Sequence, residues 1–448
     1  MTLSKGQYVP VIRQKITDSL KVPLPIFTER DIHLPRIPGK AMVVIGMRRS
    51  GKTTFLWQCL ASKIKSGVPR KTLLYFSFED ERLIGMTADD LQWIIEEYYI
   101  LHPELRDKCR VTLFFDEIQV VQGWEQFVRR LMDTEQIDIF LSGSSSLLLS
   151  REVATSMRGR GVEVLVHPFS FRESLRHKNA EPATSWNRLS KAKRSAVEKC
   201  FRDYLVAGGF PEAQGLTSRD RAVLLRSYVD VATLRDVIER HQVTNPIALR
   251  WVQRHLLGSP ASPFSIQKFY NTLKSQGVAV GKNTLHQYLA HLEDAFLIRT
   301  VSLHTASERQ RMVNPRKSYP VDPGLISVYE RMGRSNLGHA LETVVFLELE
   351  RRGYDIGYIR TREGWEVDFF ATCSFDKKLL IQVCADTEIP ETLEREVRAL
   401  QSAAITYPDA VPLLLTLDTV LPHESLPKEI RWMSVLEWLL NTTDDVVD

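Results

Sequence analysis

The chain has 448 residues, 44% of them hydrophobic and 25% charged, and its 59 basic and 55 acidic side chains give a net charge of +4. This length predicts two to four domains of an ordinary globular protein, and so small a net charge does not by itself indicate a nucleic-acid partner. The five cysteines form no C-x-x-C pair, which argues against a disulfide framework or a cysteine metal site. No charged-then-apolar segment opens the sequence and no apolar run reaches about 18 residues, so we expect a cytoplasmic protein with no membrane partner.

Residues 1–40 contain one helical stretch followed by proline-rich segments that disfavour regular structure. From Ala41 to about Arg172, strands and helices alternate. The expected strands are AMVVIG, TLLYFSF, VTLFFDE and IDIFLSGSS. Apolar runs of this kind are typical of parallel strands covered on both faces, so they predict a doubly wound α/β domain.

The first of these strands leads into a glycine-rich turn and then an amphipathic helix. The turn reads Gly46-x4-Gly51-Lys52-Thr53, the spacing of a phosphate-binding loop. Backbone amides would surround the phosphates of ATP, Lys52 would reach the β and γ groups, and Thr53 would bind Mg²⁺. The expected nucleotide-binding residues are Gly46, Arg48, Arg49, Ser50, Gly51, Lys52, Thr53 and Thr54.

Two adjacent carboxylates end the third strand, VTLFFDE. Asp116 would hold Mg²⁺ and Glu117 would polarise the attacking water. The fourth strand ends in hydroxyls, of which Ser142 or Ser144 would sense the γ-phosphate unless they are ordinary turn serines.

Two arginines, Arg158 and Arg160, follow in the glycine-flanked sequence MRGRG. They are candidates for an arginine finger, which often comes from a neighbouring subunit, and the alternative is a solvated basic loop. A finger acting between subunits would imply a homo-oligomer, for which a hexamer is one candidate.

From about Glu173 to Gly258 the pattern is helical, and the following segment predicts a helix-turn-helix with a wing. Its second helix would bury Leu285, Leu289 and Leu292 and leave polar side chains outside. The segment after it collects Arg299, His304, Arg309, Arg311, Arg316 and Lys317 against one acid, Glu308. A basic wing beside such a helix favours DNA as a partner, although the winged helix could instead only pack beside the ATPase. The residues assigned to DNA binding are Lys282, Asn283, His286, Gln287, Arg309 and Arg311.

Several fragments together resemble, in order, the prokaryotic AAA-type ATPases fused to a C-terminal domain of unknown function. They are GMRRSGKTT, DEIQ, LSGSSSLLLSRE with RGRG, HPFSFRE, GGFPEA, LEDAFLI, YPVDPGL, LETVVFLELERRG, EVDFF, and IQVC with TLEREVRAL. The resemblance spans about Lys40 to Leu400. It implies an ASCE-type ATPase core, a winged-helix middle region and a C-terminal domain of restriction-endonuclease-like fold, and it implies no single biological role.

A nuclease of that fold carries an acid on one strand and an acid-x-Lys pair on the next. Here a degenerate version is expected from Glu342, Glu366, Asp368 and Gln382, with Glu366 and Asp368 on one face of their strand. Gln382 replaces the acid and Cys384 replaces the lysine, and Lys377 and Lys378 are candidates to substitute for that lysine. We therefore expect a nuclease-like scaffold that does not cleave.

The expected organisation is an N-terminal extension (1–40), a P-loop ATPase core (41–172), a helical lid or linker (173–258), a winged-helix region (259–337) and a nuclease-like α/β domain (338–448). The leading hypothesis is an oligomeric ATPase that moves or remodels duplex or branched DNA, including junctions. The alternatives are a nucleotide-gated regulatory or defence switch acting on protein partners and an ATP-driven nuclease. No cofactor beyond ATP and Mg²⁺ is expected.

Overall fold

A computed structural model describes residues 5–143, 157–330, 337–373, 377–420 and 426–441. The chain divides into two compact units, residues 1–167 and 168–448. Among the described residues, no helix combines the length and the apolar character that a bilayer crossing requires.

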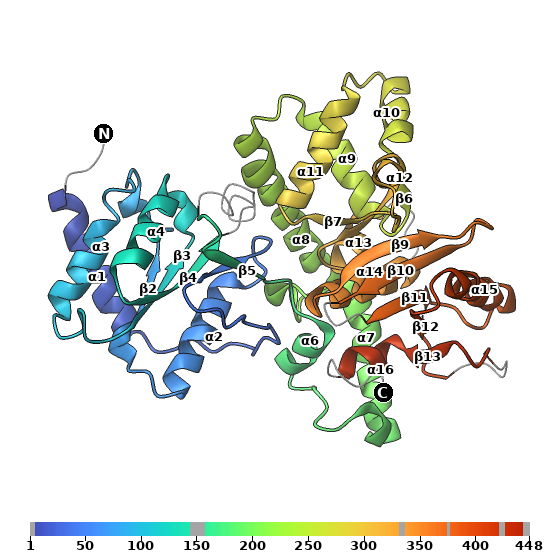
Figure 1. Cartoon of the computed structure of the whole chain (residues 1–448), viewed down its shortest axis with the longest axis horizontal. Coiled ribbons are helices and arrows are strands. Elements are labelled where there is room, and N and C mark those ends of the chain that lie inside the picture. The colour runs from blue at the N-terminus through green and yellow to red at the C-terminus, as the bar shows by residue number, and fades with distance from the viewer. Residues whose placement is uncertain (1–4, 144–156, 331–336, 374–376, 421–425, 442–448) are drawn as a thin grey trace. The chain divides into compact units, whose positions relative to one another are not determined.

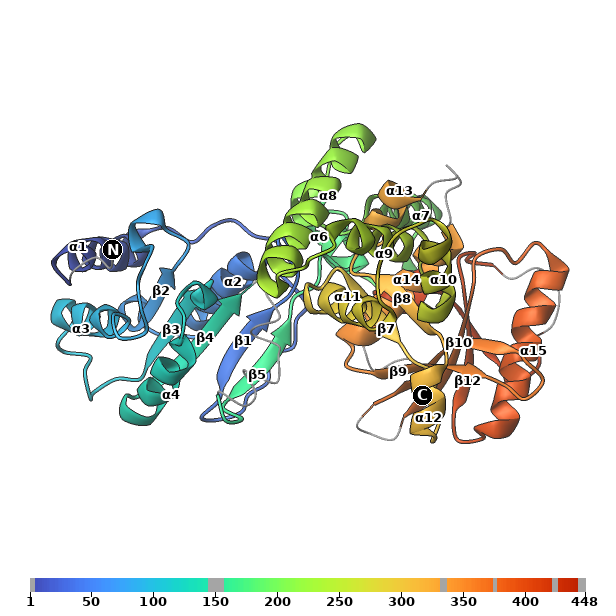
Figure 2. The same cartoon turned by 90° about the horizontal axis from the view of Figure 1, so that it is seen from above.

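The first unit is a five-stranded parallel sheet with the strand order β2-β3-β4-β1-β5. The strands are β1 Ala41–Ile45, β2 Leu73–Ser77, β3 Val111–Asp116, β4 Ile137–Gly143 and β5 Gly161–Leu165. The helices are α1 Lys5–Lys21, α2 Lys52–Lys65, α3 Gln92–Leu101 and α4 Trp124–Thr134. Figures 1 and 2 show α2 and α4 on opposite sides of the strands, the doubly wound arrangement expected from the sequence.

The burial of each strand explains which strands of this sheet could be predicted from the sequence. Every residue of β1 and β3 is buried, as expected for strands covered on both faces. One edge strand, β5, was not predicted. Its residues are mostly half-buried, so its sequence lacks the continuous apolar run that identified the other strands.

Helix α1 packs against β2 and α3, so the segment expected as an extension is part of the first unit. It buries Tyr8, Ile12 and Ile16 completely. Its Arg13 forms an ion pair with Glu97 at 2.8 Å. Residues 22–40 contain no helix or strand, in agreement with their proline content.

The second unit begins with helices and a small sheet of order β6-β8-β7. The helices are α6 Phe171–His177, α7 Lys191–Ala207, α8 Ser218–Ala232, a π-helix Thr233–Glu239, α9 Pro246–Gly258, α10 Ile266–Ser275, α11 Lys282–Asp294, α12 Glu308–Val313 and α13 Gly324–Tyr329. The strands are β6 Pro263–Phe264, β7 Ile298–Val301 and β8 Arg316–Pro320. Helices α10 and α11 confirm the predicted helix pair. The expected basic ribbon after β7 instead contains the short helix α12.

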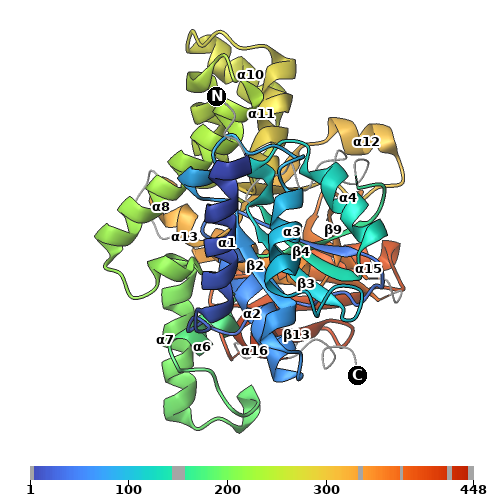
Figure 3. The same ribbon diagram turned by 90° about the vertical axis from the view of Figure 1, so that its left-hand side faces the viewer.

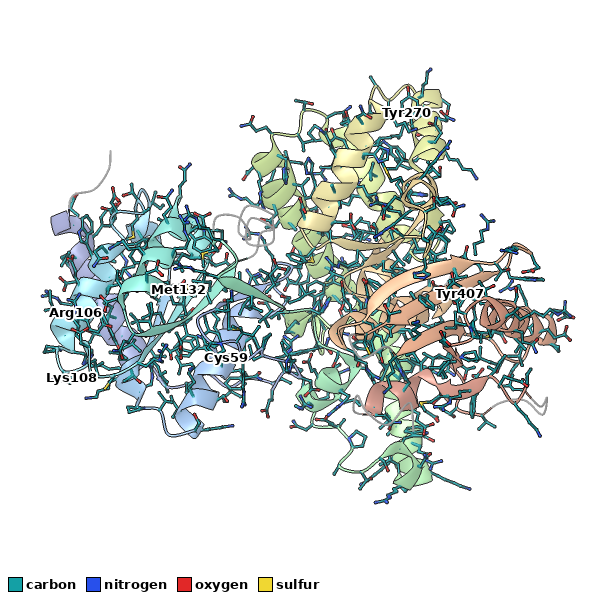
Figure 4. All side chains as sticks on the ribbon, in the orientation of Figure 1. Cys59, Arg106, Lys108, Met132, Tyr270 and Tyr407 are labelled. Atoms are coloured by element: carbon teal, nitrogen blue, oxygen red, sulfur yellow. The ribbon has the colours of Figure 1, made fainter. Side chains whose placement is uncertain are left out.

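A second, five-stranded sheet of order β13-β12-β11-β10-β9 follows. Its elements are α14 Leu337–Arg351, β9 Asp355–Arg360, β10 Glu366–Thr372, β11 Lys378–Cys384, α15 Pro390–Thr406, β12 Val411–Thr416, β13 Arg431–Ser434 and α16 Val435–Leu440. Strands β9 to β11 pair antiparallel and β11 to β13 pair parallel. Figure 2 shows α15 along one face of this sheet, with α14 on the other side. Tyr407, which follows α15 in Figure 4, packs its ring 4.9 Å from that of Phe370 on β10.

The motifs GGFPEA and YPVDPGL contact each other inside the second unit. Asp322, from YPVDPGL, accepts hydrogen bonds from the amides of Gly209 at 2.6 Å and Gly324 at 2.9 Å. A Cβ on Gly208 would lie 1.8 Å from Oδ1 of Asp322, and one on Gly324 would lie 2.5 Å from the carbonyl oxygen of Ala207. These glycines are required because backbone and carboxylate approach so closely. Burial raises the pKa of Asp322 to about 7, although both amides oppose that shift.

The close approach at Gly209 gives a stability prediction. A Cβ on Gly209 would lie 2.1 Å from the carbonyl oxygen of Phe169, whose amide donates to Gly209 at 2.7 Å. We expect Gly209→Ala to reduce the free energy of unfolding by about 2 kcal/mol or more, measured by denaturant titration. Gly281→Ala is the control, because its Cβ would meet only the Thr284 hydroxyl at 3.5 Å. Equal stability of the two variants would contradict this account of the motif.

Candidate functional site

The phosphate-binding loop joins β1 to α2 at the carboxyl end of the sheet. Gly46 and Gly51 have φ values of 145° and 101°, and Arg49 has 67°. A Cβ on Gly46 would lie 2.3 Å from the carbonyl oxygen of Val166, so only glycine fits there. Gly51 is the N-cap of α2, and therefore the amides of the first helical turn face the loop.

The remaining residues of the loop differ in exposure. Lys52 is 5% exposed, and its Nζ donates to the carbonyl oxygens of Gly46 at 3.1 Å and Met47 at 3.0 Å. Its ammonium group therefore lies within the loop, where a phosphate chain would meet it. Ser50 is fully buried. Thr53 and Thr54 are exposed and Arg48 is half-buried.

A buried arginine supports the loop from behind. Arg30 is 6% exposed and donates to the carbonyl oxygens of Ser50 at 3.1 Å and His167 at 2.5 Å. Its backbone is paired with the side-chain amide of Gln58 on α2, at 2.8 and 3.1 Å. Sequence reasoning missed Arg30, because an arginine in a proline-rich segment carries no pattern that connects it to a loop about twenty residues later.

Asp116 is the centre of the hydrogen-bond network beside the loop. It is 3% exposed and lies at the end of β3. The Thr53 hydroxyl donates to its Oδ2 at 2.9 Å, and the Tyr75 hydroxyl donates to the same oxygen at 2.7 Å. The Ser142 hydroxyl donates to Oδ1. Burial and the Asp116 charge both raise the pKa of Tyr75, so its phenol remains a donor.

The donor set fits Mg²⁺, which binds hard oxygen ligands and retains several waters. The Thr53 hydroxyl and the Asp116 carboxylate, which the sequence analysis assigned as metal ligands, lie 2.9 Å apart at the N-terminus of α2. Ser142 is fully buried against Asp116, so its hydroxyl holds that carboxylate. Ser144 lies outside the described residues.

Glu117 adopts a left-handed conformation, with φ of 56°. This costs energy in a residue with a Cβ, and such strain is concentrated at functional sites. Its amide donates to the Ser142 hydroxyl at 3.2 Å, and its Oε2 accepts a hydrogen bond from Gln119. The backbone therefore turns sharply between the two adjacent carboxylates, and they have different partners.

The two candidate finger arginines precede β5. Arg160 is paired with Asp133 of α4 and donates to the carbonyl oxygen of Arg129 at 3.4 Å, within its own unit. Arg158 is exposed, with φ of 49°.

A parallel sheet, a glycine-rich loop at a helix N-terminus and a neighbouring strand that ends in Asp116 define a P-loop ATPase domain. The family described as "AAA domain" matches residues 38–175, and a second, described as "Domain of unknown function (DUF8612)", matches residues 198–335. The first unit is therefore an ATPase domain of the AAA type.

Two curated relatives match most of the chain. The uncharacterized protein MJ1544 of Methanocaldococcus jannaschii is 36% identical over 380 residues, covering 84% of this chain and 81% of that protein. An uncharacterized protein of Haemophilus influenzae is 33% identical over 352 residues, covering 78% and 83%. The chain belongs to the same family of AAA-domain proteins as these two.

Solved structures match with low scores. The Walker-type ATPase PABY2304 of Pyrococcus abyssi is 16% identical with a TM-score of 0.41, covering 71% of this chain and 94% of that one. The Orc1 protein of Aeropyrum pernix, solved in complex with DNA, is 13% identical with a TM-score of 0.26, covering 73% and 92%.

The surface of α11 agrees with its sequence pattern. Leu285, Leu289 and Leu292 are buried, at 1%, 4% and 0% exposure. The four polar residues assigned to its outer face are exposed: Lys282, Asn283, His286 and Gln287. Figures 1 and 3 show α10 beside α11, and the two helices are in contact.

The basic segment after α11 was partly mispredicted. Arg309 and Arg311 are exposed on α12, where Arg311 pairs with Glu308 at 3.1 Å. Arg299 instead pairs with the buried Glu350 at 2.5 Å, and Lys317 is buried. Strand β8 reads Arg-Lys-Ser-Tyr-Pro, a polar pattern that predicts exposure, but all of its residues except Arg316 are buried, so the burial of its lysine could not be predicted from the sequence.

Lys317 lies among the carboxylates that the sequence analysis assigned to a degenerate nuclease-like site. Its side chain is 2% exposed, and its Nζ is 3.2 Å from Glu342, 2.9 Å from Glu366 and 3.0 Å from Asp368. Tyr319, two residues further along β8, donates to Glu342 at 2.7 Å. The predicted acids therefore do converge, but around a lysine from another sheet.

Gln382 and Glu396 extend the cluster. The Asp368 amide donates to Oε1 of Gln382 at 3.2 Å, and Nε2 of Gln382 donates to Glu396 at 2.5 Å. A cavity of about 550 Å³ adjoins these residues. Lys378 pairs with Thr372 at the far end of the β10–β11 hairpin, so neither it nor Lys377 supplies the missing lysine.

Burial and mutual repulsion shift the pKa values in this cluster. Burial, together with the Asp368 charge, raises the pKa of Glu342 to about 7 despite Lys317. Burial alone would lower the pKa of Lys317, but Asp368 and Glu342 raise it well above its usual value. Lys317 is therefore charged at neutral pH and neutralises part of the acidic cluster.

Replacing Lys317 by methionine should leave the buried carboxylates uncompensated. We expect a loss of about 3–5 kcal/mol in the free energy of unfolding at pH 8. A carboxyl group whose folded-state pKa is raised stabilises the fold below its unfolded value of about 4.5 and loses that contribution as the pH rises through about 7. The deficit of Lys317→Met should therefore be smaller at pH 5 than at pH 8, as measured by denaturant titration at both pH values.

The matched control is Lys378→Met, because Lys378 lies on the sheet that carries Glu366 and Asp368 and is only half-buried. It should change stability by less than about 0.5 kcal/mol at either pH. A pH-independent deficit in Lys317→Met would contradict the electrostatic account of the cluster.

Proposed function

We propose that this chain hydrolyses ATP with Mg²⁺ and uses the turnover to move or remodel duplex or branched DNA. The observation that carries the ATPase part is the network around Asp116. It brings the Thr53 hydroxyl, the Asp116 carboxylate and the Ser142 hydroxyl together beside the loop that contains Lys52.

Each residue has a role in the proposed reaction. Lys52 and the loop amides neutralise and orient the phosphates, and Thr53 and Asp116 hold the metal. A Mg²⁺ ion held by these two residues would supply positive charge against the charge that develops on the phosphates during transfer. Glu117 orients and activates the attacking water, and Ser142 positions both carboxylates, since it donates to Asp116 and accepts from the Glu117 amide.

An arginine finger completes the proposed site. Arg158 is exposed and is the better placed of the two to reach another subunit, whereas Arg160 would first have to leave Asp133. A homo-oligomer, with a hexamer as one candidate, is part of this proposal.

The ATPase proposal predicts separate effects for two variants. Glu117→Gln should retain nucleotide binding and reduce turnover by at least about 100-fold, because the carboxylate base is lost while the loop is intact. Lys52→Ala should lose nucleotide binding. The measurements are steady-state phosphate release and equilibrium binding of a fluorescent ATP analogue. Wild-type turnover by Glu117→Gln would refute the role assigned to that carboxylate.

The DNA part of the proposal rests on the exposed face of α11 and on α12. Lys282, Asn283, His286 and Gln287 offer donors and acceptors at the N-terminal end of a helix whose other face is buried. Side chains of these types in this position suit phosphates and base edges. The exposed Arg309 and Arg311 add positive charge. The nuclease-like region would contact DNA without cutting it, because Lys317 already occupies its carboxylates.

The DNA proposal predicts an effect of charge on both affinity and salt dependence. Replacing Lys282, Arg309 and Arg311 by glutamine should weaken duplex or junction binding and reduce the slope of log affinity against log salt. Fluorescence anisotropy across a salt series measures both quantities. The control replaces the exposed Lys191, Lys193 and Arg202 of α7 by glutamine, which removes the same charge. Equal losses in the two triple variants would reduce the effect to net charge and contradict a specific face.

ATP turnover with single-stranded, duplex and junction DNA separates the candidate functions. Stimulation by one of these substrates supports remodelling. Turnover unchanged by all of them, with ATP binding intact, would instead favour a nucleotide-gated switch that acts on a protein partner.

A further inference from the structure

A cluster of two histidines and an aspartate shares no residue with the phosphate-binding loop or with the acidic cluster around Lys317. His241 follows the π-helix Thr233–Glu239, and His291 and Asp294 lie near the end of α11. One ligand atom from each of the three lies within 4.8 Å of the others. The imidazole rings are stacked, with centroids 3.7 Å apart and planes inclined by 16°.

We propose that His241, His291 and Asp294 bind a divalent transition metal of the zinc class. Tetrahedral zinc sites use imidazole and carboxylate donors with metal–ligand bonds of about 2.0–2.2 Å. The three donor atoms, which lie within 4.8 Å of one another, would therefore have to move closer together by roughly one ångström to share an ion. Two nitrogen ligands and one oxygen favour such a metal over Mg²⁺ or Ca²⁺, which prefer oxygen alone. A water would take the fourth position.

The hydrogen bonding of the two rings supports this assignment. Among the described residues, Nε2 of His241 and Nδ1 of His291 are buried nitrogens with no hydrogen-bond partner. A buried polar atom without a partner is costly, and a metal bond would compensate that cost. Burial lowers the pKa of His241 to about 4, and burial also lowers that of His291.

The local backbone supplies the second support. The π-helix before His241 is seven residues long. Such helices are rare, and they frequently occur at functional sites. It contacts α11, and the amide of Val243 donates to the carbonyl oxygen of Ile238 at 3.1 Å just beyond it. The wide turn thereby brings His241 against a helix about fifty residues later in the chain.

Two features of the cluster oppose metal binding. The parallel rings must turn out of their stack for both nitrogen lone pairs to meet one ion. The charge of Arg240 also reaches the cluster, where it lowers the pKa of His241 and opposes the rise in the pKa of Asp294 that burial causes. Removing that charge should strengthen metal binding, which gives the proposal a second, opposite-signed test.

A metal at this position would join the end of α11 to the segment that follows the π-helix Thr233–Glu239. The exposed polar residues assigned to DNA binding lie at the N-terminal end of α11. The ion would therefore fix the C-terminal end of the helix and would not contact the DNA. The metal site does not depend on the proposed ATP hydrolysis or on DNA binding.

The experiment is titration of the chelator-treated full chain with Zn²⁺ by calorimetry and with Co²⁺ by visible absorption, in buffer without Mg²⁺ or nucleotide. We expect one ion per chain and a rise in the melting temperature on binding. His241→Gln, His291→Gln and Asp294→Asn should each weaken binding by at least about 100-fold, and Arg240→Gln should strengthen it several-fold.

Two controls distinguish this site from others. His286→Gln removes an exposed histidine from the same helix, and Lys52→Ala alters the phosphate-binding loop. Both should bind Zn²⁺ like the wild type. The metal-free variants are compared by circular dichroism, and the exposed Asp294 provides a variant with little effect on the core. No binding by the wild type, or unchanged affinity in folded His241→Gln, His291→Gln and Asp294→Asn, would overturn the proposal.

Discussion

The carboxylate of Asp116 connects most of the parts that make the first unit an ATPase domain. It accepts hydrogen bonds from Thr53 on α2, Tyr75 on β2 and Ser142 on β4. A buried carboxylate is tolerated only when its oxygens are bonded, so the strands on either side of β3 have to supply donors at the same level of the sheet. The strand order β2-β3-β4-β1-β5 meets this requirement, because β3 lies between β2 and β4.

The second unit depends on a comparable balance of buried charge. Lys317 compensates Glu342, Glu366 and Asp368, which belong to a different sheet and to α14. The ion cluster therefore joins the small sheet β6-β8-β7 to the C-terminal sheet. Removing one partner of such a cluster is strongly destabilising, because it leaves a buried charge uncompensated. In the intact cluster, several short ion pairs offset the cost of removing these charges from water.

Several predictions made from sequence were correct because their signals are local. The apolar runs identified β1 to β4, and helical periodicity identified the buried leucines of α11. The glycine spacing of the loop and the position of Asp116 at a strand end also follow from local patterns. Strand β5 was missed, since its residues are mostly half-buried. The basic segment was overestimated, because Arg299 and Lys317 find buried partners that lie far away in the sequence.

The sequence by itself determined the phosphate-binding loop, the strand that carries Asp116 and the order of the elements, because each depends on residue spacing along one segment. Only the tertiary structure decided that Arg30 supports the loop, that Lys317 occupies the acidic cluster and that His241 meets His291. These contacts join residues that are from twenty to more than fifty positions apart. Their partners are chosen by how the sheets and helices pack, and sequence periodicity carries no information about that choice.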